Sequence, residues 1–149
     1  MAVSVTGKVL LDTNVFIDYL RADLHAEWVF GGAGPLIRFL SSVVLMELRL
    51  GADTIRRRRA VDRIQAAFPT DRLIAPLPSA FDQAGRVFRT LYGDGSGLDD
   101  RLGPVNDLLI ALSARQMGAA VVTSNLEEFR QIANHVPGLR IVAPEDRFS

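Results

Sequence analysis

The sequence contains no cysteine and only two histidines, His25 and His135. Disulfide bonds, thiolate zinc sites and cysteine nucleophiles are therefore excluded, and nothing indicates a histidine-rich metal site. No apolar run approaches the roughly 18 residues that a transmembrane helix needs. The first apolar stretch contains Lys8 and Asp12, which does not fit a signal peptide. We therefore expect a cytoplasmic protein that does not associate with a membrane.

The sequence also lacks an excess of charge of either sign, with 17 basic and 17 acidic side chains. This balance argues against a strongly basic protein that wraps nucleic acid, because such proteins need surplus Lys and Arg to displace phosphate counterions. An enzyme that gathers acidic residues around metal ions can still be neutral overall. The length of 149 residues and the hydrophobic content of 48% predict one folded domain, residues 1–149.

Short apolar strands alternate with helical patterns along the chain. The expected strands are 9–11, 37–41, 73–75, 120–123 and 139–142, and the expected helices are 15–21, 43–50, a helix capped by Thr54, 81–91, 105–117 and 126–132. The Gly/Asp/Ser-rich segment 93–100 is expected to be a loop. This alternation predicts α/β structure, a three-layer α/β/α sandwich around a short parallel sheet.

Polar side chains follow the strands at the sheet edge where such folds bind ligands. The set comprises Asp12, Thr13 and Asn14 after the first strand, Glu47, Asn106 and Asp107 in helices, and Thr123, Asn125 and Glu128 after the fourth strand. Carboxylates packed together resist ionisation unless a cation accompanies them. Oxygen ligands without Cys or paired His favour Mg²⁺ or Mn²⁺, the ions that usually serve phosphate chemistry.

Each acidic residue also has a structural explanation. Asp12 and Asn125 are suited to cap helices, and Asp107 near a helix start is favoured by the helix dipole. Glu47, in an apolar helix, could form a salt bridge with Arg49 or with another arginine. Their convergence on one edge of the sheet favours a functional site. Other phosphate chemistries fit less well, since the chain has no lysine after Lys8 and Asn14 stands where a dehalogenase-type phosphatase has its second Asp.

Four segments in order resemble the motifs of PIN domains, over nearly the whole chain. They are Leu10-Leu11-Asp12-Thr13-Asn14-Val15-Phe16-Ile17, residues 42–52 with Glu47-Leu48 and Gly51, Asn106-Asp107-Leu108-Leu109-Ile110-Ala111, and Val122-Thr123-Ser124-Asn125-Leu126-Glu127-Glu128-Phe129. The small size and the Glu-Leu-x-x-Gly form of the second motif are most similar to VapC-like toxins, the PIN ribonucleases of bacterial type II toxin–antitoxin pairs.

This resemblance implies a Mg²⁺- or Mn²⁺-dependent endoribonuclease in which Asp12, Glu47 and Asp107 are catalytic metal ligands. It also implies a homodimer and a small VapB-like antitoxin whose C-terminal segment fills the active-site groove. The family often has an Asp in the fourth motif, where this chain has Asn125, so Glu128 becomes the nearest candidate for a fourth acid. Thr13, Asn14, Asn106, Thr123 and Asn125 are expected to support the ligands or the scissile phosphate.

Two alternatives remain open at the level of sequence. The departure at Asn125 is compatible with a PIN-like module that has lost catalysis and serves in binding. A PIN nuclease of RNA processing, without an antitoxin, would carry the same motifs. The run Arg56-Arg57-Arg58-Arg59 is expected to be mainly a solvated helix face, since four successive residues cannot share one face, with one or two arginines contacting phosphate.

Overall fold

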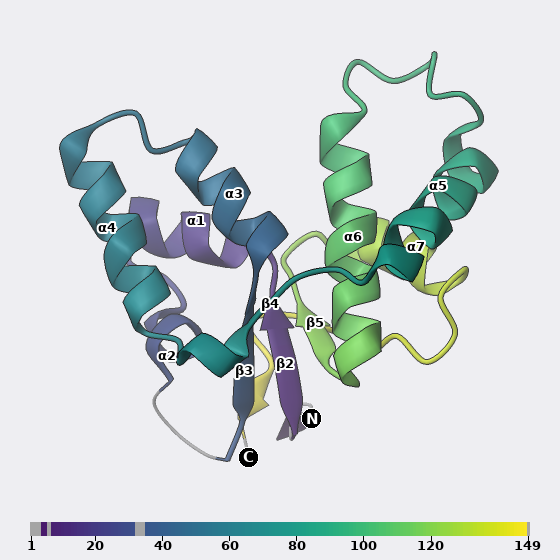
Figure 1. Ribbon diagram of the computed structural model, residues 1–149. Coiled ribbons are helices and arrows are strands. Elements are labelled where there is room, and N and C mark those ends of the chain that lie inside the picture. Colours follow the sequence, from purple (N-terminus) through teal and green to yellow (C-terminus); the bar gives the residue numbers. More distant parts are fainter. Residues whose placement is uncertain (1–3, 6, 32–34, 149) are drawn as a thin grey trace.

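The computed structural model describes residues 4–5, 7–31 and 35–148 and contains a five-stranded sheet (Figure 1). Its strands follow the order β4 (Leu73–Ile74), β3 (Ile37–Ser41), β2 (Lys8–Leu11), β5 (Ala120–Val122) and β6 (Ile141–Val142). Every neighbouring pair is parallel. The short strands β1 (Ser4–Val5) and β7 (Arg147–Phe148) form a separate parallel pair.

Helices lie on both sides of this sheet (Figure 1). One group contains α1 (Thr13–Ala22), α2 (Ala26–Phe30), α3 (Ser42–Leu50) and α4 (Ile55–Ala66). The other contains α5 (Pro78–Tyr92), α6 (Leu102–Met117) and α7 (Leu126–Ala133). The expected three-layer α/β/α sandwich with a parallel sheet is confirmed. No helix in the described ranges has both the length and the apolar character that a membrane span requires.

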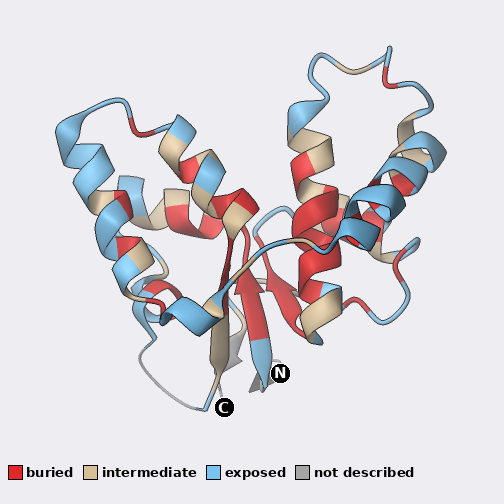
Figure 2. Cartoon of the chain, viewed as in Figure 1, coloured by how far each residue is buried: buried red, intermediate tan, exposed pale blue. Residues whose placement is uncertain are grey.

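The core lies on both faces of the sheet, as Figure 2 shows. The residues of β2 after Lys8 are fully buried, because a parallel sheet covered by helices on two sides has no face in contact with water. Helix α6 is the most buried helix, with every residue from Leu108 to Ala114 in the core. Side chains that project beyond the carboxyl ends of β2 and β5 are therefore held on a rigid base.

Several features differ from the sequence-based expectation: helix α5 begins at Pro78 and not at residue 81, and strand β6 covers only Ile141–Val142 of the expected 139–142. Helix α2 and the β1–β7 pair had no clear pattern, because each is only a few residues long. Helix α6 begins at Leu102, three residues earlier than expected, because the Asp100 carboxylate accepts hydrogen bonds from the backbone N–H groups of Leu102 (2.9 Å) and Gly103 (3.0 Å). Asp107 thus lies in the second turn of α6. The explanation that the helix dipole favours an acid in the first turn therefore does not apply to it.

The order of the strands reverses between β2 and β5. From β2 the chain adds β3 and then β4 on one side, and it later adds β5 and then β6 on the other. The crevice between the carboxyl ends of such strands is the usual ligand site of open parallel sheets. Asp12 follows β2, and Thr123 follows β5.

Candidate active site

Asp12 forms the corner between β2 and α1. It is the N-cap of α1, with extended backbone angles, and its Oδ1 accepts a hydrogen bond from the backbone N–H of Thr13 at 2.8 Å. The capping role considered for this residue is therefore real. It occupies only one carboxylate oxygen, and Oδ2 remains for other partners.

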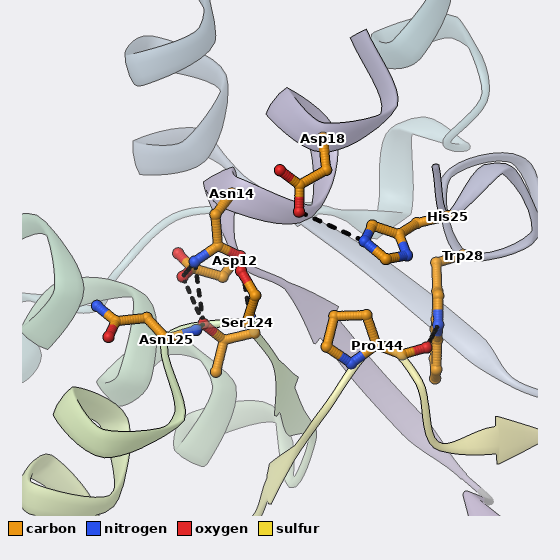
Figure 3. A network of polar contacts seen from close by, with 9 residues as sticks. Asp12, Asn14, Asp18, His25, Trp28, Ser124, Asn125 and Pro144 are labelled. Atoms are coloured by element: carbon orange, nitrogen blue, oxygen red, sulfur yellow. Dashed lines mark hydrogen bonds and ion pairs between the residues drawn. The ribbon is translucent and has the colours of Figure 1, made fainter. Parts of the chain in front are cut away.

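The second oxygen of Asp12 joins β2 to β5. Thr123 Oγ1 donates to Asp12 Oδ2 at 2.8 Å. Asn14 Nδ2 donates to the same oxygen at 2.9 Å (Figure 3). The backbone N–H of Ser124 donates to Asn14 Oδ1 at 3.2 Å. Two residues of the first motif, Asp12 and Asn14, and two of the fourth, Thr123 and Ser124, thus form one network across the strand-order reversal.

Glu47 reaches this network from α3. Thr13 Oγ1 donates to Glu47 Oε1 at 2.7 Å, which connects the first turn of α1 to the middle of α3. The expected alternative, a salt bridge from Glu47 to Arg49, is absent among the described residues. Arg49 instead pairs with Asp62 of α4 at 2.7 Å. Glu47 is therefore held by a neutral hydroxyl, and its negative charge is not compensated there.

Asp107 and Glu128 complete a group of four carboxylates. The pKa of Asp107 is raised to about 8, mainly by burial and additionally by the negative charges of Asp12, Glu128 and Glu47. The pKa of Asp12 is raised to about 6. Burial is the main cause, hydrogen bonds from Thr123 and Thr13 oppose the rise, and the charges of Glu47 and Glu128 add to it. The four acids act on one another, although they come from four different elements.

The fourth motif arranges Asn125 and Glu128 as a pair. Asn125 occupies the N-cap position of α7, but its side chain accepts no capping hydrogen bond. The Asn125 amide donates instead to Glu128 Oε2, and the Asn125 backbone N–H donates to Thr123 Oγ1 at 3.0 Å. The simple capping role expected for Asn125 is therefore wrong. Its amide positions the acid that stands nearest to the missing Asp.

Asn106 is the one expected supporting residue that the structure does not connect to the others. Its side chain is 3% exposed, and its Nδ2 is a buried donor without a hydrogen-bond partner among the described residues. A buried donor without a partner is unusual and costly. Asn106 therefore lies in the core, although it directly precedes Asp107 in the sequence. Its supporting role stays a prediction.

The donor set of this site fits a divalent cation. In the described part of the chain, none of the four carboxylates forms an ion pair with Arg, Lys or His. No three His, Cys, Asp or Glu side chains of that part already converge as a ligand cage. Mg²⁺ commonly binds through one or two carboxylates and keeps several waters, so it does not need such a cage. Asp12, Glu47, Asp107 and Glu128 are the residues that could hold it.

Tyr92 belongs to this neighbourhood but was not found from the sequence. Burial raises the pKa of its phenol, and the negative charges of Glu128 and Asp107 add to the rise. Tyr92 is the last residue of α5 and lies between the second and third motifs of the sequence. No periodicity or motif marks it, because only the packing of α5 against α6 brings it toward the acids.

A groove extends from the site between α1, α3 and α4. Its volume is about 1000 Å³, and Glu47 lies among its lining residues. Apolar side chains of the groove include Ile17, Leu20, Leu48 and Val61. Its basic lining residues are Arg21, Arg56, Arg57 and Arg63. Of the arginine run, Arg56 and Arg57 therefore line the groove, and Arg57 pairs with Asp53.

These features define a class of protein, a parallel α/β domain with clustered carboxylates at its strand-order reversal. A family model described as PIN domain matches residues 9–135. The chain belongs to the PIN domain family. PIN domains are nucleases, and they generally use divalent metal ions, so the family indicates a hydrolase that acts on nucleic acid.

Solved structures also have this fold, and several of them are VapBC structures. The chain is similar to VapBC-1 from nontypeable Haemophilus influenzae, with 25% identity, a TM-score of 0.64, and coverage of 92% of this chain and 98% of that one. It is similar to a DNA-bound VapBC from Salmonella typhimurium, with 26% identity, a TM-score of 0.65, and coverage of 93% and 99%. FitAB bound to a DNA fragment shares the fold at 21% identity, with a TM-score of 0.62 and coverage of 91% and 94%. No curated protein matches the chain.

Proposed function

We propose that this protein is a Mg²⁺- or Mn²⁺-dependent endoribonuclease that acts as the toxin of a toxin–antitoxin pair. The observation that carries the proposal is the convergence of Asp12, Glu47, Asp107 and Glu128 without a cationic partner in the described residues. Such a cluster is stable and ionised only when a cation joins it. The likeness to VapBC toxin–antitoxin structures supports the toxin assignment.

Asp12 and Asp107 would be the main ligands of a divalent ion, and Glu47 and Glu128 would be additional ligands. When bound, the ion would supply Lewis-acid activation of water and neutralise charge on the phosphodiester. Thr123 and Asn14 orient Asp12 by donating to its Oδ2. Thr13 orients Glu47 in the same way, and the Asn125 amide orients Glu128, so the chain itself fixes the direction of three of the four carboxylates.

The groove beside Glu47 supports the antitoxin partner. Its apolar lining suits an amphipathic segment, and its arginines suit acidic side chains on that segment. A chain bound there would also cover the approach to Glu47, which is how a C-terminal antitoxin segment would inhibit the enzyme. The homodimer rests on the family resemblance and is tested by the mass in solution. The cytoplasmic location also rests on the family resemblance, and fractionation would test it.

The test is cleavage of single-stranded RNA with Mg²⁺, with Mn²⁺ and with EDTA, by the wild type and by Asp12→Asn. We expect cleavage with metal by the wild type alone. If the wild type cuts no RNA under any condition, the catalytic proposal is wrong, and a binding module becomes the better explanation. If it cuts RNA but no adjacent or co-purifying antitoxin exists, a nuclease of RNA processing replaces the toxin.

A further inference from the structure

Tyr92 lies at one end of a helical hairpin that borders the acid cluster. Helices α5 and α6 pack against each other and are joined by the loop 93–101 (Figure 1). The last turn of α5 therefore lies alongside the first turns of α6, which carry Asp107. The charges of Asp107 and Glu128 both act on the Tyr92 phenol, in agreement with this placement.

The ring of Tyr92 is supported on one side by Phe88. The two ring centroids are 5.1 Å apart with an interplanar angle of 56°. Phe88 is itself held by the loop, since a Cβ on Gly95 would lie 3.0 Å from Phe88 Cζ. Phe88 is packed against the core, and Tyr92 is half-buried. The Tyr92 ring therefore packs against Phe88 on one side and is partly exposed to solvent on the other parts of its surface.

The phenol has no structural task that the described contacts reveal. Its hydroxyl has no hydrogen-bond partner among the described residues, and Gly93, with φ of 63°, turns the chain away directly after it. A ring that only filled space could be Leu or Phe at the same position. A half-exposed tyrosine beside carboxylates is better explained by a ligand that brings its own flat surface.

We propose that Tyr92 stacks against a nucleobase of single-stranded RNA next to the phosphodiester that is cut. Proteins that read single-stranded RNA commonly stack unpaired bases on aromatic side chains. A ring at the border of the carboxylates would hold the neighbouring base while the phosphate lies at the acids. Tyr92 would then contribute to substrate affinity and to the choice of cleavage site. This inference rests on the proposed ribonuclease function.

The test compares Tyr92→Leu, Tyr92→Phe and Tyr92→Trp with the wild type and with Phe81→Leu. Phe81 is a matched control, because it is an aromatic residue on the same helix with 55% exposure and lies eleven positions before Tyr92. The measurements are KM and kcat on a short RNA, a cleavage map at nucleotide resolution on a mixed RNA pool, and Tm.

We expect Tyr92→Leu to raise KM about tenfold with a smaller change in kcat, the loss expected for one base–aromatic stack. It should also change the nucleotide preference in the cleavage map. Tyr92→Phe and Phe81→Leu should stay within about twofold of the wild type. If Tyr92→Leu lowers Tm so far that it is not folded, Tyr92→Trp decides, because its larger ring should lower KM or shift the preference.

Unchanged KM and an unchanged map for folded Tyr92→Leu would overturn the stacking role while the ribonuclease proposal stands. So would an unchanged Tyr92→Trp if the leucine variant does not fold. A loss of kcat alone in Tyr92→Leu and Tyr92→Phe would also overturn it, in favour of a phenol that positions the acids. If the wild type cuts no RNA, both proposals fail together.

Discussion

Thr13 and Glu47 are joined by a hydrogen bond of 2.7 Å from the threonine hydroxyl to the glutamate carboxylate. The two residues are 34 positions apart and come from different helices, α1 and α3. The bond ties the orientation of Glu47 to the corner that also holds Asp12. A neutral donor of this kind orients a carboxylate without neutralising it, so the charge remains for a cation.

Replacing Thr13 with Val should remove this orientation while keeping the shape of the side chain. We expect kcat/KM for RNA cleavage to fall about tenfold, the lower end of the effect of removing a residue that orients a metal ligand. Thr13→Ser keeps the hydroxyl and should retain most activity. Cleavage rates at saturating Mg²⁺ and circular dichroism check both variants. Equal rates for Val and Ser variants would show that the bond is not needed.

The metal-free protein should lose stability as the pH rises from about 5 to about 8. The folded pKa values of Asp12, about 6, and Asp107, about 8, lie above the ordinary value of 3.8. Between these values the folded state binds more protons than the unfolded state, so the free energy of unfolding decreases with increasing pH. Thermal unfolding in EDTA measures this decrease.

Asp107→Asn should weaken that dependence on pH. Without the acidic group, the loss of stability between pH 5 and pH 8 should shrink, and at pH 8 the Tm should be higher than that of the wild type by about 3 °C, equivalent to about 1 kcal/mol in a domain of this size. Millimolar Mg²⁺ should raise the Tm of the wild type at pH 8 more than that of the variant. If the Tm of the wild type in EDTA rises with pH over this range, the raised pKa values of Asp12 and Asp107 are wrong.

Changes in the fourth motif should show whether it faces the metal. Asn125→Asp replaces an amide donor to Glu128 with a second carboxylate, so it should lower the Tm in EDTA through repulsion. The same change should tighten Mg²⁺ binding and lower the metal concentration for half-maximal cleavage. Glu128→Gln should weaken metal binding modestly. If a metal titration of both variants matches the wild type, the fourth motif is structural.

Asn106→Leu should stabilise the protein. The buried Nδ2 has no partner in the described residues, and such a donor costs about 1–3 kcal/mol, whereas leucine has a similar shape and no polar atom. We expect a gain of about 1 kcal/mol, or about 2–4 °C in Tm. Ser113→Ala is the control on the same helix, because the Ser113 hydroxyl is satisfied by the Leu109 carbonyl at 2.8 Å. It should bring no gain. A lower Tm for Asn106→Leu would indicate an unseen partner.

Two neighbouring arginines test the groove as the antitoxin site. Arg56 lines the groove, and Arg59 belongs to the same run but does not. Arg56→Glu should weaken binding of an acidic antitoxin segment about tenfold, whereas Arg59→Glu should change it by less than threefold, since surface charges away from a contact contribute little. Calorimetry with the antitoxin measures both. If both variants lose the same affinity, the arginines act through long-range electrostatic attraction and the groove is not the binding site.

Much of the architecture could be read from the sequence. Val9, Leu10 and Leu11 form a continuous apolar run, which is typical of a strand covered on both faces. Thr54 was expected as an N-cap, and its hydroxyl accepts the hydrogen bond from the backbone N–H of Arg57 at 3.1 Å. These features depend on residues close together in the chain, so local pattern was sufficient.

The sequence predicted which acidic residues belong to the site, but it did not predict the contacts that those residues make. Asp12 at a strand end and Asp107 in a motif are visible in the sequence. The sequence did not show that Arg49 pairs with Asp62 and leaves Glu47 to Thr13, or that the Asn125 amide turns to Glu128. Tyr92 had no signal at all. Each of these contacts depends on how separate helices pack.

The sequence by itself therefore determined the five strands of the main sheet, their alternation with helices and the acidic residues, because periodicity and turn residues act over a few positions. The tertiary structure decided which acids share one electrostatic environment, which donors orient them and which aromatic ring stands beside them. The reason is that burial and charge interactions depend on distance in space. Asp12 and Thr123 are 111 residues apart in the chain, and their side chains meet at 2.8 Å only because β2 and β5 are neighbours in the sheet.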